Sequence, residues 1–141
     1  MKYYDSNCIF CKIAHGEIKA YKIYEDDHVI AFLDTNPKSM GHALVIPKRH
    51  YDNFLNVDKA IMHRVYDVAQ KIGQADMVAL GAVGINVLTN CYEPAGQTVM
   101  HFHVHVIPRY INNERHQIDM KDNLDDKNLP AIVTKIQQYI K

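Results

Sequence analysis

The segment Thr98–Arg109 contains three histidines, His101, His103 and His105, that alternate with large apolar side chains. Successive side chains of a β-strand point to opposite faces, so this spacing places the imidazoles on one face and the apolar side chains on the other. In a helix the same residues would spread over more than half of the circumference. We therefore predict a strand whose apolar face is anchored in the core and whose other face presents a histidine cluster.

A cluster of imidazoles has two chemical uses, and the histidines alone leave both open. Neutral imidazoles can ligate a metal ion, or one ring can act as a nucleophile while its neighbours hold its tautomer or contact an anion. The preceding loop favours the second use, because it is rich in turn-forming residues and ends in the amide of Gln97 and the hydroxyl of Thr98. Gly96 lets backbone N–H groups approach a phosphate or an oxyanion closely. This stretch therefore indicates phosphoryl chemistry.

These residues resemble the signature of the histidine-triad family, in which three histidines alternate with apolar residues. Further matches follow in the same order along about residues 7–110, among them the Cys-x-x-Cys pair, Ala31–Asp34, Gly41–His50 and Asn90. The pattern is most similar to the Hint-type nucleoside phosphoramidase branch, as found in bacterial Hit-like proteins. Residues 111–141 carry no matching motif.

The periodicity of the chain predicts an α+β fold in a single domain spanning residues 1–141. Short alternating or apolar stretches, bounded by turn residues, predict an antiparallel meander of about five strands. A main helix is predicted between Asn56 and Leu80, where apolar residues recur in steps of three and four behind Asp58 as the N-cap. Residues 112–127 are predicted to form an extended tail or loop, and Leu129–Ile140 a short C-terminal helix. The predicted strands are Tyr21–Glu25, His28–Leu33, Ala43–Ile46, Gly84–Asn90 and the histidine strand.

Length and composition limit the classes of function. A chain of 141 residues can form an ordinary core without disulfides, and its balanced formal charge argues against an electrostatic nucleic-acid interface. No apolar run has the length of a membrane span, and the N-terminus lacks the apolar core of a signal peptide. Three cysteines, two of them in one Cys-x-x-Cys pair, suit a metal or redox site better than disulfides. These features predict a cytoplasmic protein without nucleic-acid or membrane partners.

The Cys-x-x-Cys pair, Cys8 and Cys11, has a spacing that suits zinc, which takes four ligands in a tetrahedron. A redox motif would need a strand before the pair, and only a short polar segment precedes Cys8. From the residues alone, Cys91 and several histidines are candidates for the two missing ligands. Resemblance to zinc-containing members of the family implies His50 and His101, and hence one structural Zn²⁺ per chain.

The resemblance also implies a reaction. His103 would attack the α-phosphorus of a purine nucleotide and form a nucleotidyl-histidine intermediate that water hydrolyses. The products would be a nucleoside monophosphate, AMP above all, and the leaving group of a phosphoramidate or acyl-adenylate. For the ring to attack through one nitrogen, the other must donate its proton to a fixed acceptor. In the family that acceptor is the backbone carbonyl at the first triad position, here His101.

The remaining site residues follow from the same resemblance. Asp34, at the predicted end of the second strand, would accept hydrogen bonds from the two ribose hydroxyls, and His42 would contribute to proton handling. Aromatic and branched residues of the N-terminal third are either walls of a base pocket or plain core. Members of the family pair as homodimers through the main helix and a strand. The residues predicted to contact the phosphate or leaving group are His105, Gln97, Thr98 and Asn90, and the candidate base-pocket residues are Ile9, Phe10, Ile18 and Phe32.

Three alternatives to this function remain at the level of sequence. The first is a hydrolase of dinucleoside polyphosphates in the same family. The second is a nucleotide-binding module without catalysis. The third is a zinc hydrolase in which His101, His103 and His105 together hold a catalytic metal.

Overall fold

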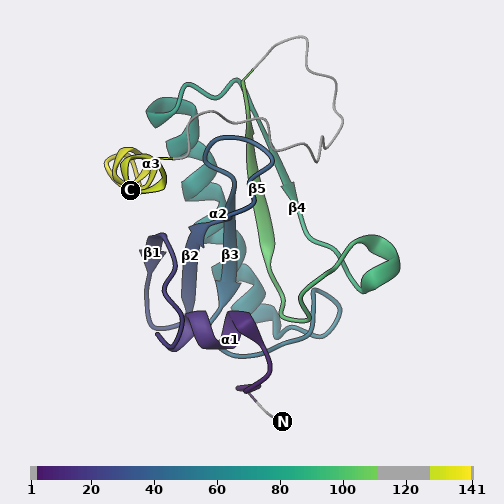
Figure 1. Ribbon diagram of the computed structural model, residues 1–141. Coiled ribbons are helices and arrows are strands. Elements are labelled where there is room, and N and C mark those ends of the chain that lie inside the picture. The colour runs from purple at the N-terminus through teal and green to yellow at the C-terminus, as the bar shows by residue number, and fades with distance from the viewer. Residues whose placement is uncertain (1–2, 111–127, 141) are drawn as a thin grey trace.

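The computed structural model describes residues 3–110 and 128–140, so the predicted extended segment 112–127 lies outside the described residues. Within these ranges the chain forms three α-helices, one short 3₁₀ helix and five strands (Figure 1). None of these helices combines the length and apolarity that crossing a membrane requires. The helices are α1 (Ile9–Ala14), α2 (Lys59–Ala79), α3 (Leu129–Gln137) and the 3₁₀ helix η1 (Glu93–Ala95). The strands are β1 (Lys22–Glu25), β2 (Val29–Leu33), β3 (Ala43–Pro47), β4 (Gly84–Leu88) and β5 (Val104–Arg109).

The described strands form one antiparallel sheet in the order β1-β2-β3-β5-β4. Five strands with a long central helix and a C-terminal helix confirm the predicted α+β class. The predicted simple meander needs one correction, because β5 lies between β3 and β4. The burial of the two strands gives the reason: four of the six residues of β5 are buried, as suits an interior strand, whereas every residue of β4 is at least partly exposed.

Two groups of apolar side chains cover the two faces of the sheet. On one face, residues such as Val45 and Val104 pack with the buried stripes of α2 and α3. On the other face, Phe32, Leu44 and their neighbours pack against α1. Figure 1 shows α2 behind the sheet and α1 near its lower end. The α1 side is therefore covered by only a short helix, which leaves room for a cavity beside it.

Local capping explains the ends of α2, which matches the predicted main helix. The side chain of Asp58 accepts a hydrogen bond from the backbone N–H of Ile61 and so caps the N-terminus as predicted. The helix ends at Ala79, and Gly81 follows with a φ of +73°, the left-handed conformation that glycine adopts without strain.

The histidine strand begins later than predicted. The ladder of β5 starts at Val104, so His101 and His103 lie in an irregular segment before the strand and only His105 belongs to it. The alternation nevertheless continues through this segment, since Phe102 and Val104 are fully buried in the core on the α2 side. All three imidazoles thus leave the chain toward the α1 side.

Candidate active site

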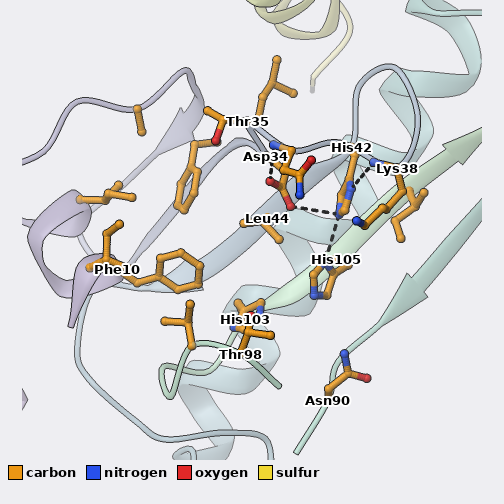
Figure 2. A pocket seen from close by; sticks show the side chains of 18 of the residues that line it. Phe10, Asp34, Thr35, Lys38, His42, Leu44, Asn90, Thr98, His103 and His105 are labelled. Atoms are coloured by element: carbon orange, nitrogen blue, oxygen red, sulfur yellow. Dashed lines mark hydrogen bonds and ion pairs between the residues drawn. The ribbon is translucent and has the colours of Figure 1, made fainter. Parts of the chain in front are cut away.

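A cavity of about 710 Å³ opens on the α1 side of the sheet, a volume in the usual range for small-molecule sites. His103 and His105 line it together with Asp34, which follows β2, and His42, which precedes β3. In the view of Figure 2, Phe10 lies to the left of His103 and Asn90 to the right. Every residue predicted to contact a nucleotide lines this cavity except Gln97.

The exposure of the four candidate base-pocket residues shows which of them are core and which are surface. Phe10 and Phe32 are buried and pack edge to face at a centroid distance of 5.7 Å. Ile9 and Ile18 are 47% and 37% exposed and also line the cavity. The first pair therefore belongs to the core as well as to the cavity, whereas the second pair offers free apolar surface.

His103 is held in one tautomer by the backbone. Its Nδ1 donates a hydrogen bond of 2.6 Å to the carbonyl oxygen of His101, which leaves Nε2 with the lone pair of a neutral ring. The ring is 6% exposed and packs against the rings of Phe10 and His105. Burial lowers the pKa of His103, so the ring stays neutral near pH 7. A neutral imidazole with a free nitrogen is a nucleophile.

A second hydrogen-bonded chain fixes the tautomers of His42 and His105. The backbone N–H of Lys38 donates to Nδ1 of His42 at 3.0 Å, so the proton of the neutral His42 ring is on Nε2. That Nε2 lies 3.0 Å from Nδ1 of His105 and donates to it (Figure 2). Nε2 of His105 then carries a proton and can donate to an anion in the cavity. Burial lowers the pKa of His42 to about 3 and that of His105 to about 4, so both rings are neutral.

Asp34 stands beside this chain. Its Oδ1 accepts a hydrogen bond of 2.9 Å from the backbone N–H of Asn36, and its Oδ2 lies 3.8 Å from Nε2 of His42. The ligand atoms of Asp34, His42 and His105 are close enough together to surround a cation. The bond from Lys38 argues against that use, because it keeps the proton on the Nε2 that would have to ligate the metal.

The structure places Gln97 away from the cavity and corrects its predicted phosphate contact. Its Nε2 donates to the carbonyl oxygens of Asp52 and Val99, at 2.6 and 2.9 Å. Its Oε1 accepts from the backbone N–H of Tyr92 and from Nδ2 of Asn53. With its four hydrogen-bonding positions used and 1% of its surface exposed, this side chain joins two loops and has none left for a ligand.

The loop of residues 93–98, which we call the glycine loop, contributes Ala95, Gly96 and Thr98 to the wall of the cavity. Gly96 has a φ of +101°, and a Cβ placed on it would come within 3.5 Å of Nδ2 of Asn90. Glycine adopts this positive φ without strain and so permits the turn, and the 3.5 Å separation is an ordinary van der Waals contact. Thr98 lines the cavity beside them. Two residues near these groups, Lys38 and Thr89, were missed by the sequence analysis, since neither belongs to a recognisable pattern.

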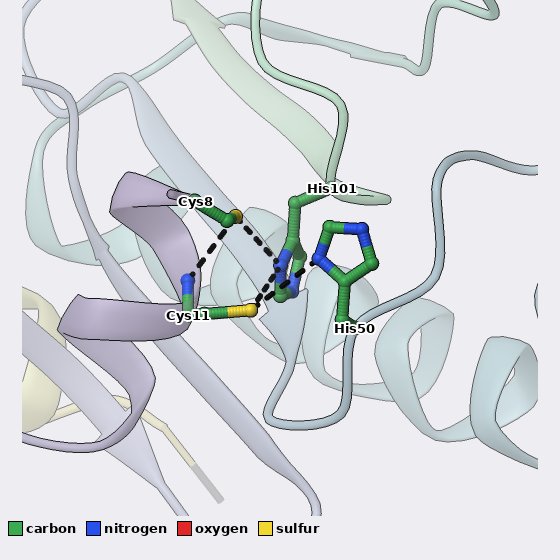
Figure 3. A group of neighbouring side chains, drawn as sticks. All are labelled: Cys8, Cys11, His50 and His101. Atoms are coloured by element: carbon green, nitrogen blue, oxygen red, sulfur yellow. Dashed lines mark hydrogen bonds between the residues drawn. The ribbon is translucent and has the colours of Figure 1, made fainter. Parts of the chain in front are cut away.

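His101, the first triad histidine, belongs to a different cluster. Nδ1 of His101 lies 3.4 Å from Sγ of Cys8, and Nδ1 of His50 lies 3.3 Å from Sγ of Cys11 (Figure 3). All four ligand atoms lie within 4.8 Å of one another. The structure thus brings together the four residues predicted as a metal tetrad. It also separates His101 from the other two triad rings, which argues against a catalytic metal held by all three.

The outer contacts of the tetrad suit metal binding. Nε2 of His101 donates to the carbonyl oxygen of Pro47 at 2.8 Å, and Nε2 of His50 donates to Oδ1 of Asp52 at 3.2 Å. Each Nδ1 therefore has its lone pair directed into the cluster, as in metal-ligating histidines whose other nitrogen is held by an oxygen. Two thiols and two imidazoles form a donor set that matches a closed tetrahedral site.

A family model described as the HIT domain matches residues 15–112. The chain belongs to the HIT domain family. Within the matched range lie the triad, Asp34 and His42, whereas both cysteines of the tetrad precede it. The matched range therefore includes the cavity apart from its α1 residues Ile9, Phe10 and Ile13, and two of the four tetrad residues.

Individual HIT relatives agree with this assignment. Protein hit of Bacillus subtilis (strain 168) is 42% identical over 120 residues, which cover 85% of this chain and 83% of the relative. Adenylylsulfatase HINT3 of Arabidopsis thaliana is 40% identical over 104 residues, which cover 74% of this chain and 53% of that longer protein. The crystal structure of a Zn-bound histidine triad family protein from Mycobacterium smegmatis has a TM-score of 0.84 and 31% identity, covering 95% of this chain and 93% of that one.

Proposed function

We propose that this HIT protein hydrolyses nucleotide substrates and releases a nucleoside monophosphate, above all AMP, from phosphoramidates or acyl-adenylates through a nucleotidyl-histidine at His103. The observation that carries the proposal is the 2.6 Å bond from Nδ1 of His103 to the carbonyl oxygen of His101, in a cavity of nucleotide size. This bond leaves Nε2 as the attacking atom. A lone pair on a buried, neutral imidazole is the requirement for attack on phosphorus.

The proposed reaction has two displacements at one phosphorus. Nε2 of His103 first forms a bond to the α-phosphorus while the bond to the leaving group breaks, and the leaving nitrogen or oxygen departs with the electron pair. The imidazolium that results keeps its proton on Nδ1, which still donates a hydrogen bond to the carbonyl oxygen of His101. Water then attacks phosphorus and the bond to Nε2 breaks, so that its electron pair restores the neutral ring. The proton that water releases balances the proton that the leaving group takes up. The sum is the addition of one water across the bond to the leaving group.

The other cavity residues divide between the phosphate and the nucleoside. Nε2–H of His105 donates a hydrogen bond to a phosphoryl oxygen. The hydrogen-bonded chain from Lys38 through His42 keeps the proton of His105 on this nitrogen. Asn90 and Thr98 contribute further donors to the phosphate or the leaving group. Asp34 accepts hydrogen bonds from the ribose hydroxyls through Oδ2, since its Oδ1 already accepts a hydrogen bond from the backbone N–H of Asn36. A purine base lies against the apolar wall that Ile9, Phe10, Ile18 and Phe32 form.

One relative suggests the range of leaving groups to test. The Arabidopsis protein is named an adenylylsulfatase, a name that describes cleavage of an adenylyl group from sulfate. Applied to this chain, the same attack at the α-phosphorus would release sulfate as the leaving group in place of an amine or a carboxylate. A substrate series with a common adenylyl group and amine, carboxylate, sulfate and nucleotide leaving groups separates this range from hydrolysis of dinucleoside polyphosphates.

The experiment that tests the proposal is mass spectrometry of protein quenched with acid or denaturant while it turns over adenosine phosphoramidate. We expect an adenylyl adduct on the peptide that contains His103, formed before steady state, and no adduct in His103→Ala. Turnover by wild type without any adduct, or an adduct on another residue, would contradict the mechanism. Binding of AMP without turnover would instead indicate a nucleotide-binding module.

For the tetrad we propose one structural zinc per chain, held by Cys8, Cys11, His50 and His101. The support is the closed set of two sulfur and two nitrogen donors and the zinc-bound neighbour from Mycobacterium smegmatis. With four protein ligands, the ion would have no open position for substrate. Its chemical contribution would be to hold the segment that leads into β5.

We also propose that the cytoplasmic form is a homodimer that pairs through α2 and β4. Within the described sheet β4 is an edge strand, and its Val87 is 48% exposed. Val78 of α2 is 64% exposed. An apolar edge of this kind favours pairing with another copy. Light scattering after size exclusion tests the proposal, with Val87→Lys expected to yield a monomer.

A further inference from the structure

His103 lies outside the sheet ladder, so other contacts must set its position. The segment 101–103 precedes β5 and is anchored on the β3 side by two hydrogen bonds. Nε2 of His101 donates to the carbonyl oxygen of Pro47 at 2.8 Å, and the backbone N–H of Phe102 donates to the carbonyl oxygen of Tyr51 at 2.6 Å. Both bonds act on the residues before His103 and both come from one side.

The opposite anchor comes from the end of β4. The ladder between β4 and β5 ends at the pair Leu88–His105. The next residue, Thr89, donates a hydrogen bond from Oγ1 to the carbonyl oxygen of His103 at 2.6 Å. This side-chain bond therefore continues the attachment of β4 one step beyond the ladder and reaches the main chain of His103 itself.

We propose that Thr89 is a positioning residue for His103, a role that rests on the proposed function of the same cavity. The bond from Nδ1 of His103 to His101 fixes the ring relative to its own segment, but it does not fix where that segment lies. The Thr89 hydroxyl supplies this second constraint, because it ties the carbonyl of His103 to β4. Attack on phosphorus requires a placement accurate to less than about 1 Å, and losing that accuracy costs on the order of 100-fold in rate.

The residue after Thr89, Asn90, connects this constraint to the reaction. Asn90 lines the cavity and packs against Gly96 in the glycine loop. Since Thr89 and Asn90 are adjacent, the Thr89 bond holds His103 at a fixed distance from this wall of the cavity, which contacts the phosphate or leaving group in the proposed reaction.

The test compares two substitutions of Thr89, one that removes the hydroxyl and one that keeps it. Thr89→Val keeps the shape of the side chain and removes the donor, whereas Thr89→Ser keeps the donor and removes a methyl group. We expect Thr89→Val to lower kcat for adenosine phosphoramidate at least tenfold with KM changed less than threefold, and Thr89→Ser to keep kcat within about threefold of wild type. Thr134→Val is the matched control, because Thr134 makes a similar bond of 3.1 Å to the carbonyl of Pro130 on α3.

A second measurement does not depend on turnover. In histidine-labelled protein without nucleotide, the ring resonances of His103 should broaden or split in Thr89→Val and remain single in Thr89→Ser and Thr134→Val. Wild-type kcat in Thr89→Val, or an equal loss in Thr89→Ser, would overturn the positioning role. If wild type fails to turn over the phosphoramidate while the His103 resonances still respond to Thr89→Val, the proposed function fails and the positioning role stands. Unchanged resonances in Thr89→Val would overturn the role itself.

Discussion

The carbonyl oxygen of His101 accepts the Nδ1 proton of His103 at 2.6 Å, although the two rings belong to different clusters. The ring of His101 faces the cysteines, and the ring of His103 lines the cavity. One residue thus serves the tetrad through its side chain and the nucleophile through its main chain. A substitution of the His101 ring leaves this acceptor in place, so the two roles can be separated by experiment.

The first prediction concerns the nucleophile. His103→Ala should lower turnover of adenosine phosphoramidate by several orders of magnitude, because a covalent nucleophile acts as a unit with the rest of the site. The fold and nucleotide affinity should change little. Steady-state rates, calorimetric binding of AMP and circular dichroism measure the three quantities, with His63→Ala, an exposed histidine of α2, as control. A rate in His103→Ala above a tenth of wild type would remove His103 from its role.

Asp34 provides a prediction about the sugar. Asp34→Ala should weaken binding of AMP by about 1.5–3 kcal/mol, the usual loss for hydrogen bonds to a charged acceptor, and should weaken binding of deoxy-AMP much less. Calorimetric titration of both nucleotides measures the difference. Asp27→Ala, in the exposed turn between β1 and β2, is the control for loss of a carboxylate. Equal losses for the two sugars would show that Asp34 does not contact the ribose.

The third prediction is that the free energy of unfolding depends on pH because of the buried carboxyl of Asp76. This residue of α2 is fully buried, and neither carboxylate oxygen has a hydrogen-bond partner within the described part of the chain. Burial raises the pKa of Asp76 to about 8, and the neighbouring Tyr110 has its pKa raised by burial and by the Asp76 charge. The folded state therefore binds the proton more tightly than the unfolded state. Protonation of Asp76 therefore stabilises the folded state fully below about pH 4, and this contribution is lost as pH rises to about 8.

The measurement is denaturant unfolding of wild type and Asp76→Asn at several values between pH 4 and 8. Each pKa unit corresponds to about 1.4 kcal/mol, so the wild type should lose stability relative to the variant by an upper bound on the order of 5 kcal/mol across this range. The difference between the two proteins cancels the titration of all other groups. Parallel pH profiles would mean that Asp76 does not titrate in this way.

The sequence predicted those elements that depend on interactions between residues close together in the chain. The limits of α2 follow from its apolar periodicity and the Asp58 cap, and both could be read from adjacent residues. The alternation of the histidines predicted their common side of the sheet but not the start of β5 at Val104. An extended segment alternates whether or not a partner strand is present, and only the partner defines the ladder.

Long-range partners explain what the sequence could not predict. The amide of Gln97 resembles a phosphate donor until its contacts with Asp52 and Asn53, 45 and 44 residues away, are seen. Thr89 acts through a carbonyl 14 residues distant, and a backbone acceptor leaves no trace in the sequence. The insertion of β5 beside β3 has the same origin, because it depends on pairing between residues far apart in the sequence, such as Ala43 with Val106.

The last prediction concerns the metal. We expect elemental analysis of gently purified protein to find one zinc per chain, with zinc lost in Cys8→Ser and His50→Ala and retained in Cys91→Ser, whose thiol lies outside the tetrad. Full occupancy in the first two variants would exclude these ligands, and zinc-free wild type would exclude the site.

The effect of removing zinc follows from where its ligands lie. The cysteines are at the start of α1, His50 follows β3, and His101 precedes β5. The N-terminal segment reaches the same place, since the backbone N–H of His50 donates to the carbonyl oxygen of Tyr3 at 2.7 Å. One ion would therefore join three segments that are distant in sequence, which ties its binding energy to folding. Chelation should lower Tm strongly. Turnover by protein that remains folded should fall less, because the carbonyl of His101 that holds His103 stays in place. A loss of turnover without a change in Tm would instead assign the metal to the chemistry.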